Sequence, residues 1–224
     1  MDAQSQVGQE QFATAPIWHT CCVLALLTAS SGLLAFVHLG SASAKLGHLS
    51  LFVIVTLMEW VVFAFSLWNS SVVFVEFVKR AARAPRSLLL DIPVALLLSA
   101  ITFVVALILA RVLGQSGWAS VQGMRPNNGF EIAAWIVMAI SAGICEETVF
   151  RGYLQRQISF FSGRVSIGIF GQAAVFGLCH AYQGWKNMVL IFVLGCIYGV
   201  SVVVRRGLRA NMIAHAGVDI LAAF

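Results

Sequence analysis

The sequence predicts an all-α, polytopic membrane protein with about seven transmembrane helices. Three observations support this class. The chain of 224 residues is 60% hydrophobic and only 10% charged, whereas soluble globular domains average roughly 45–50% apolar and 25% charged residues. The apolar residues form long continuous blocks. They do not alternate with polar residues over ten-residue spans, as transmembrane β-strands would require.

Seven segments approach the roughly 20 apolar residues that a helix needs to cross a hydrocarbon core of about 30 Å. They are residues 17–41, 50–75, 89–113, 129–155, 166–183, 185–204 and 209–224. The last segment is short, and we expect it to tilt little or to end inside the membrane. Residues 1–16 carry no Lys or Arg and no small-residue cleavage site. They are therefore expected to form a polar tail rather than a signal peptide.

A polar loop at residues 114–128 divides the chain into two halves. Residues 17–128 hold three segments and this loop, and residues 129–224 hold the other four segments. No internal repeat relates the two halves, which disfavours a transporter built from repeated units.

The distribution of basic residues predicts the orientation in the membrane. Ten of the fourteen Lys and Arg residues follow the second, fourth and sixth segments: Lys79, Arg80, Arg83, Arg86, Arg151, Arg156, Arg164, Arg205, Arg206 and Arg209. If these loops face the cytoplasm, the N-terminus is cytoplasmic and the C-terminus external. The net charge of +5 is then explained by topology and anionic lipid, with no need for a nucleic-acid partner. The pattern suits a bacterial inner membrane.

Ionisable residues inside membrane helices are costly, and they usually mark a functional site. In the first half they are Glu59 and Asp91. For both we expect a structural role, although Glu59 could line a cavity or pair with Arg111.

The stretch ISAGICEETVFRGYLQRQ at residues 140–157 holds three charges within six positions. On a helix, Glu147 and Arg151 are four residues apart and can pair on one face. Glu146 points about 100° away from Glu147. We therefore expect Glu147 and Arg151 to neutralise each other and Glu146 to remain free to act.

Two further stretches carry histidines, FGLCHAYQG with Phe176 and His180 and NMIAHAGVD with His215 and Asp219. A single histidine in an apolar helix is more often structural than a ligand. The four-residue spacing of His215 and Asp219 suits either two ligands of one metal or a hydrogen-bonded pair. Together with Glu146 these residues are the ingredients of hydrolysis, and they would require a water-filled pocket.

Three motifs in this order resemble the CPBP (ABI) family of intramembrane proteases, which is related to the type II CAAX prenyl endopeptidases. EETVFR is similar to the family's EExxxR motif, FGLCH to FxxxH and HAGVD to HxxxN/D. The resemblance covers about residues 129–224. It implies a helical fold with a polar cavity, and an endopeptidase acting on a membrane-tethered, possibly lipidated CAAX-like substrate.

By this resemblance Glu146, His180, His215 and Asp219 correspond to the catalytic set, and Glu147, Arg151 and Phe176 to supporting positions. The family's mechanism is argued as metal-dependent or as driven by glutamate without metal. Asp219 stands where an Asn is common, and an ionised Asp cannot donate a hydrogen bond to an oxyanion. Asp219 could instead be a metal ligand or orient His215. We expect a divalent metal, with zinc the expected ion, held by some of the four catalytic positions.

Two alternatives to a protease stay open. The first is a maturation, immunity or scaffolding protein of the same fold, because some members of the family act in bacteriocin immunity. A proton-relay transporter is the other. Glu146, His180 and His215 can lie at the same depth in the membrane only under two conditions. The fourth helix must be long, with Glu146 near the membrane midplane, and the fifth must be tilted or start within the membrane.

Overall fold

The computed structural model describes residues 15–39, 47–68, 85–114 and 124–224 of the chain. These residues are helical and contain no strand, which confirms the all-α prediction. The elements are α2 Ile17–Leu39, α3 His48–Trp68, α5 Pro85–Val112, α7 Gly129–Glu146, π-helix η1 Glu147–Leu154, α8 Gln155–Ser162, α9 Val165–Cys179, 3₁₀ turn η2 Ala181–Gln183, α10 Trp185–Arg205 and α11 Arg209–Ala222. Most of the tail predicted at residues 1–16, and part of the loop at 114–128, lie outside the described residues.

Five described stretches are long and apolar enough to cross a membrane: α2, α3, most of α5, the run α7–η1–α8, and α10. The predicted segments 166–183 and 209–224 correspond to shorter helices. Helix α9 has 15 residues and α11 has 14. At about 1.5 Å per residue α11 is about 21 Å long, so this helix is short, as expected.

The run α7–η1–α8 is longer than the predicted segment 129–155, because it continues without a break from Gly129 to Ser162. Glu146 ends the 18 residues of α7 within this stretch of 34 residues. The EETVFR motif therefore begins near the middle of this run, and the expectation of a long fourth helix is confirmed. The motif itself is π-helical from Glu147 to Leu154. Single turns of π-helix are rare and are often found at functional sites.

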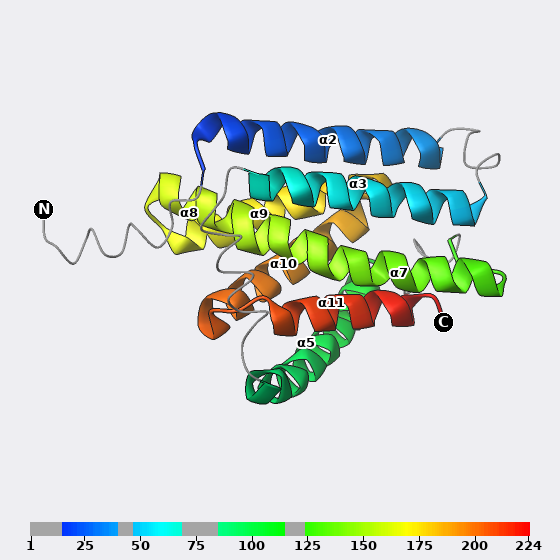
Figure 1. The fold of residues 1–224 in the computed structure, drawn as a ribbon. Coiled ribbons are helices and arrows are strands. Elements are labelled where there is room, and N and C mark those ends of the chain that lie inside the picture. Colours follow the sequence, from blue (N-terminus) through cyan, green and yellow to red (C-terminus); the bar gives the residue numbers. More distant parts are fainter. Residues whose placement is uncertain (1–14, 40–46, 69–84, 115–123) are drawn as a thin grey trace, which may run out of the picture.

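The helices pack in layers around η1 (Figure 1). Helix α3 lies between α2 and α7, and α11 packs against both α7 and α5. Helix α9 packs between α8 and α10. All eight residues of η1 are buried, and the main apolar cluster joins this segment to α2, α3 and α9 through Val23, Val62, Phe150 and Phe176.

Close contact between α7 and α11 depends on Gly143. A Cβ atom at this position would stand 2.7 Å from the Met212 carbonyl oxygen and 2.9 Å from Ala216 Cβ. Such distances exclude any side chain, since both neighbours belong to the facing helix. Trp135 of α7 also donates from Nε1 to the Asp219 carbonyl oxygen at 3.0 Å. These two contacts set the position of α11, and hence of its histidine, relative to the glutamates.

Asp91 has the structural role expected for it. Its Oδ1 accepts a hydrogen bond from Arg205 Nη2 at 2.7 Å, and its Oδ2 lies 2.8 Å from Arg209 Nη2. The carboxylate therefore ties the start of α5 to the turn between α10 and α11.

A buried polar chain joins the start of α2 to η1 and α8. His19 Nε2 donates to the Phe65 carbonyl oxygen at 3.0 Å, because a carbonyl can only accept. In the neutral ring Nδ1 then accepts from the Tyr153 hydroxyl at 2.7 Å. That hydroxyl in turn lies 3.0 Å from Thr20 Oγ1, which accepts from Gln157 Nε2 at 2.7 Å. These bonds hold the long helix in place on the side opposite α11.

Candidate active site

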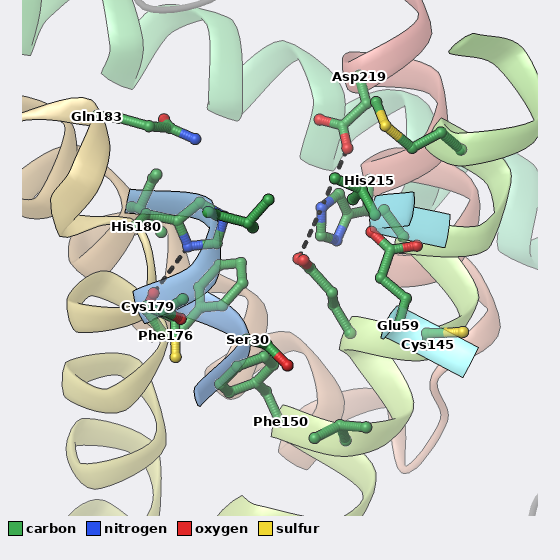
Figure 2. A pocket seen from close by; sticks show the side chains of 18 of the residues that line it. Ser30, Glu59, Cys145, Phe150, Phe176, Cys179, His180, Gln183, His215 and Asp219 are labelled. Carbon is green, nitrogen blue, oxygen red and sulfur yellow. Dashed lines mark hydrogen bonds and ion pairs between the residues drawn. The ribbon is translucent and has the colours of Figure 1, made fainter. Parts of the chain in front are cut away.

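A cavity of about 560 Å³ lies between the helices and is lined by described residues of α2, α3, α7, η1, α9, η2, α10 and α11. Much of the wall is apolar, with Leu27, Leu34, Val55 and Met58 from α2 and α3. The predicted site residues Glu146, Glu147, Arg151, Phe176, His180, His215 and Asp219 all line it. Sequence positions up to 73 residues apart are therefore brought to one space, and Figure 2 shows His180 facing His215 and Asp219 across it.

Glu147 is the fully buried carboxylate of the pair. Its Oε1 lies 3.0 Å from Arg151 Nη1, and both side chains are at most 1% exposed. The predicted ion pair is therefore present. Asn211 Nδ2 also donates to Oε2 at 3.3 Å, and the Arg151 guanidinium lies 4.3 Å from the centre of the Phe176 ring. Buried charges persist in proteins when they are paired in this way.

The expectation that Glu147 serves only Arg151 is incomplete, because Glu147 also binds the site histidine. His215 Nδ1 lies 3.0 Å from Glu147 Oε1. Both glutamates thus reach the same imidazole, one at each nitrogen. From the 100° separation of adjacent residues in an α-helix, we expected the two glutamates to face different neighbours. The helix is π-helical from Glu147 onward, and α11 crosses beside both positions, so both glutamates contact His215.

His215 is surrounded by carboxylates. Besides Glu147 at Nδ1, its Nε2 lies 3.6 Å from Glu146 Oε2 and 3.4 Å from Asp219 Oδ2. Carboxylate oxygens only accept, so this arrangement suits a doubly protonated ring. The short bond is the one to Glu147, and it fixes the ring orientation. The Nε2–H is held by two longer contacts.

Glu146 differs from Glu147 in its exposure to the cavity. Its side chain is 20% exposed, against 0% for Glu147. Its described ionic contact is the one to His215 at 3.6 Å. The arrangement agrees with the expectation that one carboxylate is held by the fold and the other stays accessible.

His180 caps the C-terminal end of α9. Its Nδ1 donates to the carbonyl oxygen of Phe176, four residues earlier, at 2.9 Å. Since a carbonyl only accepts, Nδ1 carries the proton and the neutral ring has an unprotonated Nε2. His180 therefore offers a lone pair to the cavity.

Phe176 separates the two histidines. Its ring meets His180 edge to face at 4.9 Å and His215 at 6.2 Å between centroids. The same ring carries the Arg151 guanidinium on its face. One aromatic side chain thereby positions three polar groups, which explains its place in the motif.

The fit of a metal ion was tested on the donor groups. Among the described residues, no group of three or more His, Cys, Asp or Glu side chains is placed to hold one. His215 directs both nitrogens at carboxylates, and His180 lies on the other side of the cavity (Figure 2). The side chains as placed do not fit a metal, so no chemical step is derived through one. The zinc site stays a prediction.

Glu59 is a site residue that the sequence left undecided. It lines the cavity from α3, beside His215 and Cys145 in Figure 2, whereas Arg111 lies exposed near the end of α5. The charges of Glu146, Asp219 and His215 are near enough to act on Glu59. The sequence signal for this residue was a glutamate in the middle of an apolar segment. The spacing of residues along the chain could not show which helices it would contact.

The fold and the cavity define a multi-pass, α-helical membrane protein with an acid–imidazole cluster among its transmembrane helices. Residues 128–221 match the family model described as type II CAAX prenyl endopeptidase Rce1-like, so this part of the chain is similar to that family. The match contains every site residue predicted from the motifs and leaves out α2, α3 and α5. No match was found among curated proteins or among solved structures.

Proposed function

We propose that this protein is an intramembrane endopeptidase that hydrolyses a peptide bond in a membrane-associated substrate, with Glu146 as the general base on water. One observation carries the proposal. Of two adjacent glutamates, Glu147 is fully buried and ion-paired, while Glu146 is accessible from a cavity that His180 also lines. A positioned carboxylate beside an imidazole is the arrangement that activates a water molecule.

The reaction can be written with the protein's own side chains. Glu146 accepts a proton from water as the water oxygen bonds to the peptide carbonyl carbon. The tetrahedral intermediate carries its negative charge on the former carbonyl oxygen. Glu146 then returns the proton to the leaving nitrogen as the C–N bond breaks, which gives a carboxylic acid and an amine. The same carboxyl acts first as base and then as acid.

The two histidines take different parts in this proposal. The Nε2–H of His215 has no short hydrogen bond, since both nearby carboxylates lie at 3.4–3.6 Å, so it is available to the developing oxyanion. The unprotonated Nε2 of His180 accepts a hydrogen bond from the attacking water or from a substrate N–H group. Asp219, whose Oδ2 lies 3.4 Å from His215 Nε2, helps the shorter bond from Glu147 to orient His215.

The apolar wall of the cavity supports a substrate with an apolar anchor. Leucine, valine and methionine side chains of α2 and α3 also line the cavity. A lipidated, CAAX-like C-terminus is the substrate class that the family suggests. The expected setting is a bacterial inner membrane with a cytoplasmic N-terminus.

The proposal is tested by comparing wild type with Glu146→Gln. Membrane peptides from cells that express each form are compared by mass spectrometry, and the best candidate is then assayed with purified protein in lipid discs. We expect Glu146→Gln to lower turnover by at least about 10²-fold, the usual contribution of a general base, with the fold intact.

Glu131→Gln is the matched control, because it removes a carboxylate at the N-terminal end of α7, where Glu131 contacts Asn127 and His48. It should leave turnover unchanged. Retained cleavage in Glu146→Gln would refute the assigned base. A wild-type protein that cleaves no membrane peptide, yet still confers a cellular phenotype that Glu146→Gln preserves, would favour an immunity or scaffolding role.

A further inference from the structure

Glu59 has a buried carboxyl oxygen that the fold leaves without a partner. Its Oε2 is inaccessible to solvent and has no hydrogen-bond partner among the described residues. The side chain nevertheless lines the cavity. Leaving a buried acceptor unpaired costs the desolvation of that group, and more so when it is charged. A cation bound to the part of this carboxyl group that faces the cavity would offset this cost.

The charges around the cavity indicate what kind of donor fits. The described lining residues include four carboxyl groups and a single guanidinium. That guanidinium, on Arg151, is paired with Glu147. The remaining carboxyls, Glu59, Glu146 and Asp219, share one nearby imidazole, that of His215. The cavity near Glu59 is therefore left with an excess of acidic groups.

The position of Glu59 is fixed by contacts between α3 and α7. The neighbouring Trp60 donates from Nε1 to Ser141 Oγ at 3.1 Å, and Phe52 of α3 meets Trp135 of α7 edge to face at 5.3 Å. Glu59 therefore belongs to a fixed wall. It comes from α3, outside the part of the chain that matches the family model.

We propose that Glu59 is a specificity-determining residue that binds a cationic side chain, Lys or Arg, of the membrane-tethered peptide close to the bond that is cut. A positive charge fits for two reasons: it donates to the Glu59 carboxyl group from the cavity side, and it offsets the acidic excess where the surrounding dielectric is low. A neutral N–H group would meet only the first need. An acidic peptide residue at this place would add to the repulsion.

This inference rests on the proposed function in one respect, that the cavity takes a peptide. It concerns binding, however, and can be measured whether or not the bond is cut. The probes are fluorescent peptides that carry one C-terminal lipid. Each peptide has Lys, Gln or Glu at a single position, and this position is varied over the four residues on either side of the centre of the peptide. Dissociation constants are measured by anisotropy with the full chain in neutral lipid discs and with chelator present, so that no divalent cation can substitute for the side chain.

At one position we expect the Lys peptide to bind about tenfold more tightly than the Glu peptide, a difference of about 1.4 kcal/mol. Glu59→Gln, which keeps the shape of the side chain, should reduce this ratio to below about threefold. Glu59→Lys should reverse it. The control Glu131→Gln changes the net charge by the same amount, and it should preserve the ratio.

The inference is overturned if folded Glu59→Gln protein keeps the full preference for Lys, if wild type shows no charge preference at any position, or if none of the peptides binds. Binding with a Lys preference but without cleavage would refute the proposed function and leave the inference standing. Cleavage without any charge preference would refute the inference and leave the proposed function standing. The same binding measurements are repeated with the Glu146→Gln variant, which lacks the proposed base, so that binding is measured separately from cleavage.

Discussion

Replacing Glu147 by Gln is the change whose effect the structure defines most sharply. The substitution keeps the size of the side chain and removes its charge. Arg151, only 1% exposed, is then left in the interior without its carboxylate. Removing one partner of a buried ion pair typically destabilises a protein by about 3–5 kcal/mol. The hydrogen bonds from Asn211 and His215 are weakened as well, so we expect a loss in this range.

The assay is reversible unfolding in mixed micelles as the denaturing detergent is titrated, with Glu131→Gln as the control of equal charge change. The double variant Glu147→Gln/Arg151→Met removes both charges. Because the stranded cation is then absent, the double variant should recover most of the stability lost in the single one. The 3.0 Å hydrogen bond from His215 is weakened in both variants, so turnover should stay low even where stability recovers.

Two results would refute this reasoning. If Glu147→Gln lost less than about 1 kcal/mol, within the range of a surface pair, the pair would not be buried as described. If the effects of the single and double variants simply added, Glu147 and Arg151 would not be coupled. A stable, fully active Glu147→Gln protein would also remove the positioning role assigned to Glu147.

Gly143→Ala should destabilise the protein by about 1–3 kcal/mol through overpacking and lower turnover, because the new Cβ meets the backbone of α11. Gly217→Ala on α11 is the control, since its new Cβ meets nothing within 4 Å. A loss of stability in the control, measured by thermal melts, would contradict this account. Phe176→Leu keeps the carbonyl that binds His180 but loses the ring beneath Arg151, which should cost about 1–2 kcal/mol and lower kcat more than it raises KM; an unchanged kcat would argue against a positioning role. Elemental analysis of purified protein tests the zinc prediction: bound zinc that His180→Ala removes would support it, and full turnover in chelator with no bound metal would favour the glutamate route.

Several features could be predicted from local sequence alone. The blocks of apolar residues define the helices, since a span in lipid must satisfy its own backbone hydrogen bonds. The spacing of Glu147 and Arg151 gave their ion pair, because residues four apart are neighbours on any single helix. Each of these depends on contacts within one helix.

Contacts between helices could not be predicted in this way. Glu59 was left undecided because its neighbours, Cys145 and His215 (Figure 2), belong to helices whose rotation about their axes is not encoded by spacing. Asp91 and its two arginines are separated by more than 110 residues. The second bond of Glu147, to His215, depends on how closely α11 approaches α7 at Gly143.

The sequence by itself determined that this chain is an all-α membrane protein, and it predicted which polar residues line the cavity and that the two adjacent glutamates differ. Only the tertiary structure decided how they differ. Both approach His215, and they differ in burial, since packing leaves the Glu147 side chain 0% exposed and the Glu146 side chain 20% exposed. Burial depends on the neighbouring helices, so no pattern within a single helix could have specified it.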